Sequence, residues 1–408
     1  MQLTKFRVRK FRNILDSGEI AVDESVTCLV GMNESGKTAA LSALHRLNPV
    51  DEVTFDEQRD YPRWLLSKDR RENTISDAVP ISATFRLDDE DLAVLEDALG
   101  SGVVSKPEIT VSRRYNEDNT RWSIHHDPRS AVENLLERAG IRKKTTDLYK
   151  DVKDLDGIEE VCARLGSDES DSQKEKTAEE IASLRAELGK LDGNTTWRVA
   201  VNLLKGRLPR LFYFSEYSRL EGRIDVAALD SGGSQIGSSA DQTARALLRL
   251  ASTTPEALSG DDYEDRKAEL EAVGHELTSQ VFKYWKQNTN LRVQFDIDRK
   301  IEEIQPNRQA ITKTFLDIRV EDTRHAFTNN FGQRSSGFQW FFSFLAAFTE
   351  FEGGREPVVV LLDEPGLTLH ARAQGDLLRF INERLATAVQ VIYTTHSPFL
   401  VETDRINR

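Results

Sequence analysis

The chain has 408 residues, with 55 lysines and arginines against 68 aspartates and glutamates, which gives a net charge of −13. A protein this acidic is not a general polyanion binder, so any contact with nucleic acid requires a local basic surface. The sequence contains no run of about 18 apolar residues and no apolar leader after Met1, so we expect no membrane contact and a cytoplasmic location.

The first predicted elements surround a glycine-rich loop. Residues 2–31 are expected to form strands, of which Val26–Val30 is an apolar run typical of a buried strand, and Thr38–Leu47 is expected to be helical. Between them, Gly31–Thr38 has the spacing G-x-x-x-x-G-K-T. Its glycines allow backbone N–H groups to surround phosphate oxygens, and the helix that follows adds its N-terminal dipole.

This loop predicts a nucleotide-phosphate site. The Lys37 ammonium is expected to reach the β- and γ-phosphates, and the Thr38 hydroxyl is expected to ligate Mg²⁺. The residues predicted to contact ATP in this loop are Gly31, Asn33, Glu34, Ser35, Gly36, Lys37, Thr38 and Ala39.

The middle of the chain is mainly helical. Strands are predicted at Val79–Leu87 and Glu108–Tyr115, after which the pattern is helical from about 130 to 205 and returns to strand near 209–225. A second helical stretch follows, with an apolar face formed by Leu270, Val273, Leu277 and Val281. We therefore predict three parts: an N-terminal ATPase lobe at 1–128, a mainly helical insertion at 129–290 that is a candidate dimerisation element, and a C-terminal ATPase lobe at 291–408.

Four groups of basic residues are candidates for DNA contact, although an ordinary solvated face is the simpler explanation for each group alone. These groups are Arg7, Arg9, Lys10 and Arg12; Lys68, Arg70 and Arg71; Arg142, Lys143 and Lys144; and Lys205, Arg207 and Arg210.

The last hundred residues are expected to alternate between helix and strand, after strands at Leu291–Asp298 and Phe315–Val320. Val358–Leu362 is a run of five apolar residues, which suits a strand buried on both faces. Asp363 at its end can hold Mg²⁺, and Glu364 is placed to orient and deprotonate an attacking water. This segment supplies the carboxylates that a nucleotide site with such a glycine loop also requires.

Two further segments flank the acidic strand in the sequence. Ser335, Ser336 and Gly337 precede a strongly apolar helix, where small residues can offer N–H groups and a hydroxyl to an anion, although a plain helix cap would explain them too. The run Val389–Tyr393 is expected to lie beside the Asp363 strand, which would allow His396 to reach the γ-phosphate.

In this order, the glycine loop, the small-residue signature, the Asp-Glu strand and the histidine resemble the ABC-type ATPase heads of SMC and RecF proteins. The closest resemblance is to the OLD (overcoming lysogenization defect) family of ATP-dependent nucleases. It rests on Asn33–Thr38, Arg334–Trp340, Glu364–His370 and Thr395–Leu400, and the helical middle matches poorly. The resemblance implies an α/β fold, an ABC-type P-loop ATPase head with a helical insertion.

The resemblance also implies a mechanism. Two subunits would bind ATP and Mg²⁺ between them, with Lys37 and Asp363 from one subunit and Ser335 and Gly337 from the other. The loop Leu367–His370 would cross the interface. Glu364, Lys37 and His396 would be catalytic. Arg12 would lie near either the nucleotide or the DNA, and the sequence leaves both open.

Two departures from the family pattern matter. The signature has Ser336 where ABC transporters usually carry glycine, and Phe338 where they carry glutamine or glutamate. OLD proteins carry a TOPRIM nuclease domain after the ATPase, and none is expected within this chain. Asp296 and Asp298 have a TOPRIM-like spacing but precede the signature, so we interpret them as part of an alternating strand. Nuclease activity is therefore not expected from this chain alone.

Three functions remain open. The first is an ATPase that dimerises around ATP and controls DNA cutting, in anti-phage defence, through a nuclease linked in cis beyond Arg408 or bound in trans. The second is a regulatory ABC-type ATPase that senses a partner and releases a separate effector. The third, a transporter nucleotide-binding domain, is disfavoured by three features: Leu3–Ile14, which is similar to the opening strand of the SMC and RecF heads, the diverged signature and the large insertion.

Overall fold

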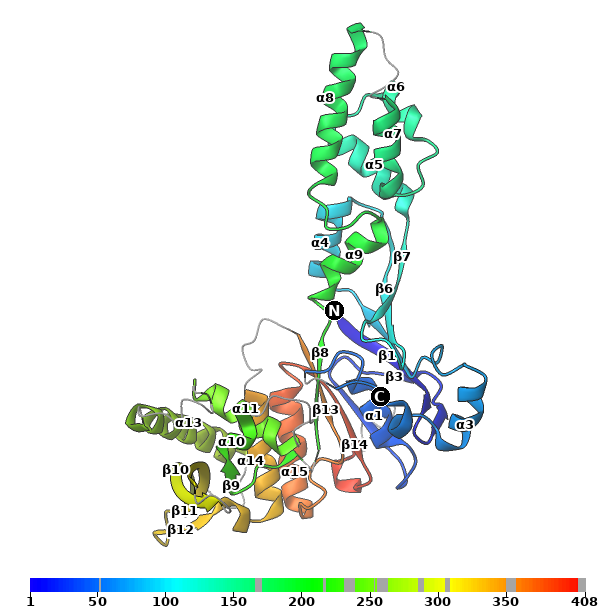
Figure 1. Cartoon of the computed structure of the whole chain (residues 1–408). Coiled ribbons are helices and arrows are strands. Elements are labelled where there is room, and N and C mark those ends of the chain that lie inside the picture. Colours follow the sequence, from blue (N-terminus) through cyan, green and yellow to red (C-terminus); the bar gives the residue numbers. More distant parts are fainter. Residues whose placement is uncertain are drawn as a thin grey trace. The chain divides into compact units, whose positions relative to one another are not determined.

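The computed structural model describes residues 1–50, 53–165, 171–215, 218–230, 239–252, 254, 263–284, 290–304, 309–349 and 357–402 (Figure 1). The chain forms two compact units. The first comprises Met1–Glu24, Arg46–Asn48 and Phe55–Arg210, and the second comprises Ser25–His45, Pro49–Thr54 and Leu211–Arg408. The sequence-based division into three consecutive parts, at 1–128, 129–290 and 291–408, remains a prediction. Within the described ranges, no helix is both long and apolar enough to cross a membrane.

The first unit contains an antiparallel sheet with the strand order β2-β1-β5-β6-β7, and β3 also pairs with β1. Its strands are β1 (Gln2–Phe11), β2 (Ile14–Asp16), β3 (Ile20–Ala21), β5 (Ile81–Arg86), β6 (Val104–Arg113) and β7 (Arg121–His126). A register shift between Leu3 and Lys5 interrupts the alternation of β1. Leu3 and Phe6 therefore both face the core although they lie three residues apart. The predictions of strands near 79–87 and 108–115 are confirmed.

Helices make up most of the rest of the first unit, and those between residues 128 and 205 confirm the helical pattern predicted from about 130 to 205. They are α2 (Glu57–Asp60), α3 (Arg63–Arg71), α4 (Asp89–Leu99), α5 (Pro128–Arg138), α6 (Lys143–Thr146), α7 (Ile158–Leu165), α8 (Asp171–Leu188) and α9 (Thr196–Lys205), with 3-10 turns at Asp147–Tyr149 and Leu155–Gly157. The local sequence determines where several of these helices begin. Asp88 and Asp91 form a capping box at α4, and Asp127 caps α5 with Pro128 in its first turn.

The second unit is built on a sheet with the order β4-β14-β13-β8. These strands are β4 (Val26–Val30), β8 (Arg210–Phe214), β13 (Val358–Leu362) and β14 (Gln390–Thr395), and β4, β14 and β13 pair in parallel. Figure 1 shows α1 (Lys37–His45) on one side of this sheet and α14 (Ser336–Thr349) and α15 (Ala371–Phe380) on the other. A π-helical turn at Ile381–Leu385 extends α15. Because helices cover both faces, β13 and β14 are buried almost throughout.

A second sheet in this unit is formed around a long hairpin of β10 (Leu291–Ile304) and β11 (Gln309–Asp322). β11 also pairs with β9 (Arg223–Asp225) and β12 (Phe327–Asn330), and α10 (Val226–Asp230), α11 (Ser239–Leu250) and α13 (Tyr263–Tyr284) accompany this sheet. The predicted apolar face of α13 is confirmed, since Leu270, Val273, Leu277 and Val281 are all buried. Asp296 and Asp298 are ordinary hairpin residues, and Asp298 pairs with Arg223.

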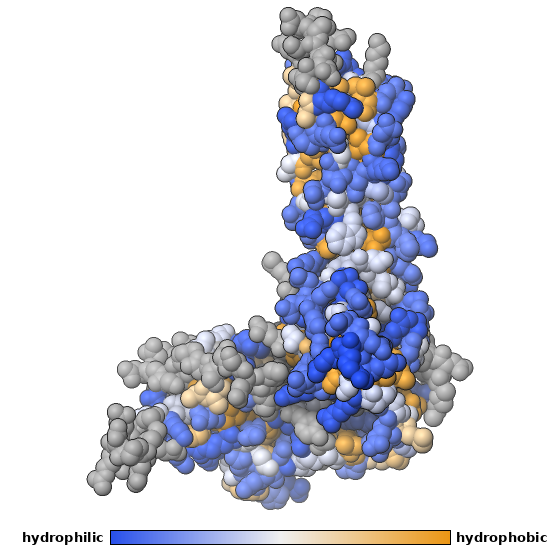
Figure 2. All heavy atoms as spheres, turned by 45° about the vertical axis from the view of Figure 1, so that its right-hand side comes forward, coloured by the Kyte–Doolittle hydropathy of each residue, from blue (hydrophilic) through white to orange (hydrophobic). Residues whose placement is uncertain are grey.

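The highly charged composition is visible on the surface of the protein (Figure 2), and its two cysteines are unpaired. The face drawn in Figure 2 is mostly hydrophilic, and its hydrophobic areas are small and separate. Cys28 and Cys162 form no disulfide, and burial raises the pKa of both thiols, which disfavours the reactive thiolate.

Candidate functional site

The candidate site lies at the carboxyl ends of β4, β13 and β14, entirely within the second unit. Parallel strands bring their carboxyl ends to one edge of a sheet, so the loops that follow them meet there. Because β14 pairs with both β4 and β13, the loop carrying His396 emerges between the glycine loop and the Asp363–Glu364 pair. This order explains how three segments far apart in the sequence form one site.

The glycine loop has the backbone geometry of a tight anion-binding turn. Glu34 and Gly36 both adopt the left-handed region, at φ 63° and 95°. A Cβ at Gly31 would lie 2.9 Å from Ser35 Oγ, so a larger residue there would require the Ser35 side chain to move. Lys37 Nζ donates hydrogen bonds of 2.9 Å to the carbonyls of both Gly31 and Met32. The ammonium therefore lies against the loop that is expected to bind phosphates.

Asp363 is the centre of a hydrogen-bond network of hydroxyl groups. Its Oδ1 accepts from Thr38 Oγ1 at 2.9 Å and from Thr394 Oγ1 at 2.8 Å, while its Oδ2 accepts from the Tyr213 hydroxyl at 2.8 Å. A threonine hydroxyl and a carboxylate are the oxygen ligands that Mg²⁺ prefers, and these two are already adjacent. The donor set of Thr38 and Asp363 thus fits the magnesium ion that a P-loop site uses.

The other predicted catalytic groups are also in contact. The Glu364 carboxylate lies 2.8 Å from His396 Nδ1 and 3.5 Å from Lys37 Nζ. Glu364 has φ 48°, a strained conformation for a non-glycine residue, and its N–H donates to Thr394 Oγ1 at 2.8 Å. One buried threonine therefore anchors both the side chain of Asp363 and the backbone of Glu364. Neither Thr394 nor Tyr213 was identified from the sequence.

The signature segment opens α14. Ser335 Oγ accepts from Phe338 N at 3.4 Å and its carbonyl accepts from Gln339 N at 3.1 Å, so Ser335 caps this helix. Ser335 is exposed, Ser336 is half-buried, and Gly337 and Phe338 are buried. In the described part of the chain, the hydrogen bonds of Ser335 stay within this segment. The role of the signature toward ATP stays a prediction.

A glutamine that the sequence reasoning missed holds the loop before α14. Gln339 Nε2 donates to the carbonyls of Phe331, Gly332 and Arg334, at 3.1, 2.9 and 2.8 Å. The two N–H hydrogens of this amide reach three carbonyls, one hydrogen being shared, and they fix the path of the chain into Ser335. The only available signal was a polar residue near the start of a strongly apolar helix.

Arg12 belongs to the first unit. Its Nε lies 3.2 Å from Oδ1 of the buried Asp60, and its guanidinium stacks over Phe11 at 5.1 Å. Its backbone is left-handed, at φ 50°. The two alternatives for its function, near the nucleotide or near DNA, both stay predictions.

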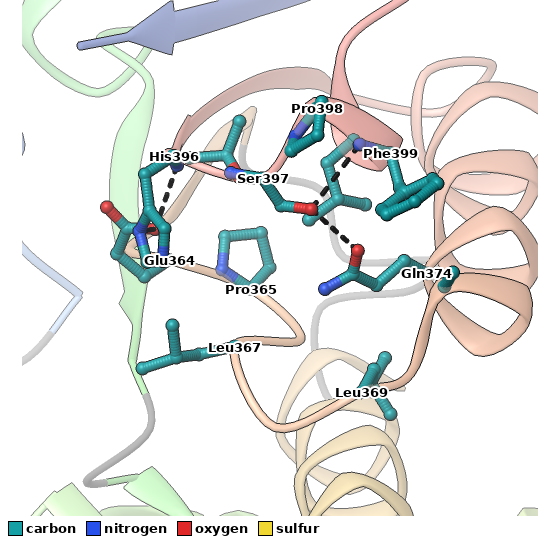
Figure 3. A pocket seen from close by; sticks show the side chains of 12 residues that line it. Glu364, Pro365, Leu367, Leu369, Gln374, His396, Ser397, Pro398 and Phe399 are labelled. Atoms are coloured by element: carbon teal, nitrogen blue, oxygen red, sulfur yellow. Dashed lines mark hydrogen bonds and ion pairs between the residues drawn. The ribbon is translucent and has the colours of Figure 1, made fainter. Parts of the chain in front are cut away.

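A pocket of about 290 Å³ opens beside Glu364, between the loops that follow β13 and β14 (Figure 3). Ser397 Oγ donates to Gln374 Oε1 at 2.7 Å, and Gln374 Nε2 donates to the Gly366 carbonyl at 3.2 Å, which ties the two loops together. Leu367 and Phe399, which help to line the pocket, are 49% and 57% exposed. The strand ends that carry the predicted catalytic residues therefore border exposed apolar side chains.

Gly366 sets the shape of the loop after β13, because it has φ +69° and a Cβ there would lie 2.8 Å from Leu369 and 2.9 Å from Leu377. Gly366→Ala is therefore expected to lower the free energy of unfolding by about 1–3 kcal/mol. Gly375→Ala is the control, because Gly375 lies within α15 with no atom near its Cβ, and it should stabilise by about 0.5–1 kcal/mol. Urea denaturation measures both, and a Gly366→Ala protein as stable as wild type would contradict the steric argument.

The fold and this site define an α/β P-loop ATPase. Residues 1–401 match the family model described as "AAA ATPase domain", and the chain belongs to that family. It is an enzyme that hydrolyses a nucleoside triphosphate, ATP.

The chain is also similar to individual proteins. It is 26% identical over 140 residues to the uncharacterized protein MJECL43 of Methanocaldococcus jannaschii, a match that covers 33% of this chain and 32% of that protein. The match thus spans about a third of the length of this curated relative. Three solved structures are similar over 98% of this chain.

The first of these structures is an Smc head bound to the C-winged helix domain of ScpA, with 11% identity, a TM-score of 0.42 and 91% of that chain covered. The second is an Smc head with an extended coiled coil bound to the C-terminal domain of ScpA, from Pyrococcus furiosus, with 11% identity, a TM-score of 0.40 and 90% covered. The third is an SMC head domain from Thermotoga maritima, with 12% identity, a TM-score of 0.34 and 91% covered.

Proposed function

We propose that the protein is an ABC-type ATPase whose two copies close around ATP, and that this closure controls a DNA-cutting nuclease of the OLD type in anti-phage defence. The observation that carries the proposal is the network centred on Asp363 and Glu364. It joins Thr38 of the glycine loop to the acidic pair and to His396, three segments separated by up to several hundred residues. The nuclease would be linked in cis or bound in trans.

The contacts support a division of roles in hydrolysis. Lys37 and the backbone N–H groups of Gly31–Gly36 bind the β- and γ-phosphates. Thr38 and Asp363 would hold Mg²⁺, which would supply positive charge to neutralise the phosphate oxygens. Glu364 orients a water and accepts its proton as the water oxygen bonds to the γ-phosphorus and the bond to the β–γ bridging oxygen breaks. His396, already 2.8 Å from Glu364, holds that carboxylate in place.

The dimer is supported by exposed apolar side chains at the rim of the site. Val30, Met32, Leu367 and Phe399 are 59%, 84%, 49% and 57% exposed, and they lie at the ends of β4, β13 and β14 or in the loops after them. Single exposed apolar residues are common, but several around one site mark an interaction surface. Ser335 is exposed at the start of α14, where a second copy would reach it.

DNA is the proposed substrate of the controlled nuclease, and α3 offers a surface that fits nucleic acid. Trp64, Lys68 and Arg71 follow helical spacing along one face, and Trp64 is 59% exposed. Within the described residues, Arg63, Lys68 and Arg71 form no ion pair with a carboxylate. Asp69 on the buried face bonds Lys10 and Tyr61, which holds α3 in position. Basic side chains around an exposed aromatic ring suit phosphates and bases.

The function is tested by the response of ATP turnover to DNA. We expect DNA to stimulate turnover, and we expect Lys68→Glu with Arg71→Glu to weaken DNA binding at least about tenfold while leaving basal turnover unchanged. The control is Lys106→Glu with Arg324→Glu, which changes the net charge equally at exposed residues outside the four basic groups. Fluorescence anisotropy measures the binding. Turnover that ignores DNA would instead favour the regulatory ATPase that senses another partner.

A further inference from the structure

We propose that Tyr213 is the positioning residue that orients Asp363 for the metal ion. This inference rests on the proposed metal site of Thr38 and Asp363. Tyr213 lies in the middle of β8, in a run of residues whose composition indicates nothing beyond a buried strand. Its hydroxyl nevertheless bonds the carboxylate that is expected to bind the metal, 150 residues further along the chain.

Strand alternation directs the Tyr213 side chain toward the site. Phe214, the next residue in β8, packs against Trp340 and Phe344 of α14, with ring centroids 5.5 and 5.3 Å apart. Tyr213 therefore faces the opposite side of the sheet, toward α1. There its ring stacks on His45, the last residue of α1, with centroids 5.4 Å apart and planes 27° apart. The ring thus has a packing contact of its own, separate from the bond that its hydroxyl forms.

The hydroxyl performs a separate task at Asp363. Both threonine hydroxyls, from Thr38 and Thr394, bond Oδ1, and Tyr213 is the donor that the structure shows for Oδ2. The terminal torsion of an aspartate is broad, so bonds to one oxygen alone leave the carboxylate plane poorly fixed. A donor on Oδ2 fixes that plane and keeps Oδ1 directed at Thr38. Groups that orient a metal ligand in this way commonly change metal affinity 10–100-fold when removed.

Tyr213→Phe is the direct test, because it keeps the stacked ring and removes only the donor. Mn²⁺ binding in the presence of a non-hydrolysable ATP analogue, followed by electron paramagnetic resonance of free Mn²⁺, should weaken about 10–100-fold. Binding of the same analogue in EDTA should not change, since Tyr213 has no role in holding the phosphates. The readout is metal affinity, so it does not depend on catalysis.

Tyr61→Phe is the matched control. Tyr61 is also buried and also donates to a buried aspartate, Asp69, but both residues lie in the first unit. It should lose comparable stability and leave Mn²⁺ affinity unchanged. Tyr213→4-aminophenylalanine, which returns an N–H donor at the same place, should restore Mn²⁺ affinity, whereas Tyr213→4-fluorophenylalanine should not.

The possible results distinguish an error in the proposed metal site from an error in the proposed role of Tyr213. If the wild type binds no Mn²⁺ with the nucleotide analogue, the proposed metal site is wrong. If the wild type binds Mn²⁺ and Tyr213→Phe binds it equally well, or if both Tyr→Phe proteins lose affinity equally, the role of Tyr213 is overturned. If Tyr213→Phe does not fold, the comparison of the amino and fluoro side chains decides the question.

Discussion

Glu364→Gln is expected to keep ATP binding and to lower ATP turnover by about 10²–10⁴-fold, the usual contribution of a general base. The substitution preserves size and leaves the Thr394 bond to the backbone N–H in place. It removes the negative charge that faces His396 and Lys37. It also removes the carboxylate that we propose as the proton acceptor for the attacking water. Binding should survive because the glycine loop and Lys37, which are expected to hold the phosphates, are unaltered.

Phosphate release measures turnover, and equilibrium binding of a fluorescent ATP analogue measures affinity. Glu383→Gln is the control, because Glu383 is an exposed carboxylate of the same unit that lies in the turn Ile381–Leu385. Its turnover should match that of the wild type. A Glu364→Gln protein with normal turnover would exclude Glu364 as the base, and loss of ATP binding would indicate a structural role instead.

The sequence predicted the core of this site because its motifs carry their own local structure. The apolar run Val358–Leu362 must be buried on both faces, so it lies inside a sheet, and the carboxylates at its end reach the sheet edge. The run Val389–Tyr393 follows the same logic and pairs beside it, as expected. Lys37, Glu364 and His396 were therefore predicted as one cluster, and the structure brings their side chains into contact.

Contacts made through strand order were not predictable in this way. Tyr213 differs from its apolar neighbours only by a hydroxyl, and its role depends on β8 lying next to β13, which no local pattern encodes. Thr394 carries no motif of its own in the sequence, and its two bonds require β14 to be adjacent to β13. The exposure of Met32 and Phe399 is also invisible in a sequence, because an apolar residue there predicts burial.

Mixing two inactive proteins, Lys37→Ala and Ser335→Arg, is expected to restore ATP turnover. If each site takes its phosphate loop from one copy and its signature from the other, a mixed dimer contains one intact site and one site with both defects. Random pairing makes half of the dimers mixed, so about a quarter of all sites would be intact, and turnover should approach a quarter of the wild-type value. Ser335→Arg is expected to inactivate the site because Ser335 is exposed at the helix start. A bulky side chain there would obstruct the ATP that is bound to the other copy.

The control for this experiment places both defects in one chain. The double variant Lys37→Ala, Ser335→Arg mixed with Lys37→Ala offers no intact phosphate loop beside a normal signature, so it should show no recovery. Differently tagged copies confirm that mixed dimers form. Absence of recovery in confirmed mixed dimers, or full activity of Ser335→Arg alone, would exclude a shared site. Lys37 and Asp363 would then act without a second copy. The exposed apolar side chains of Val30, Met32, Leu367 and Phe399 would then be a contact surface for a different protein.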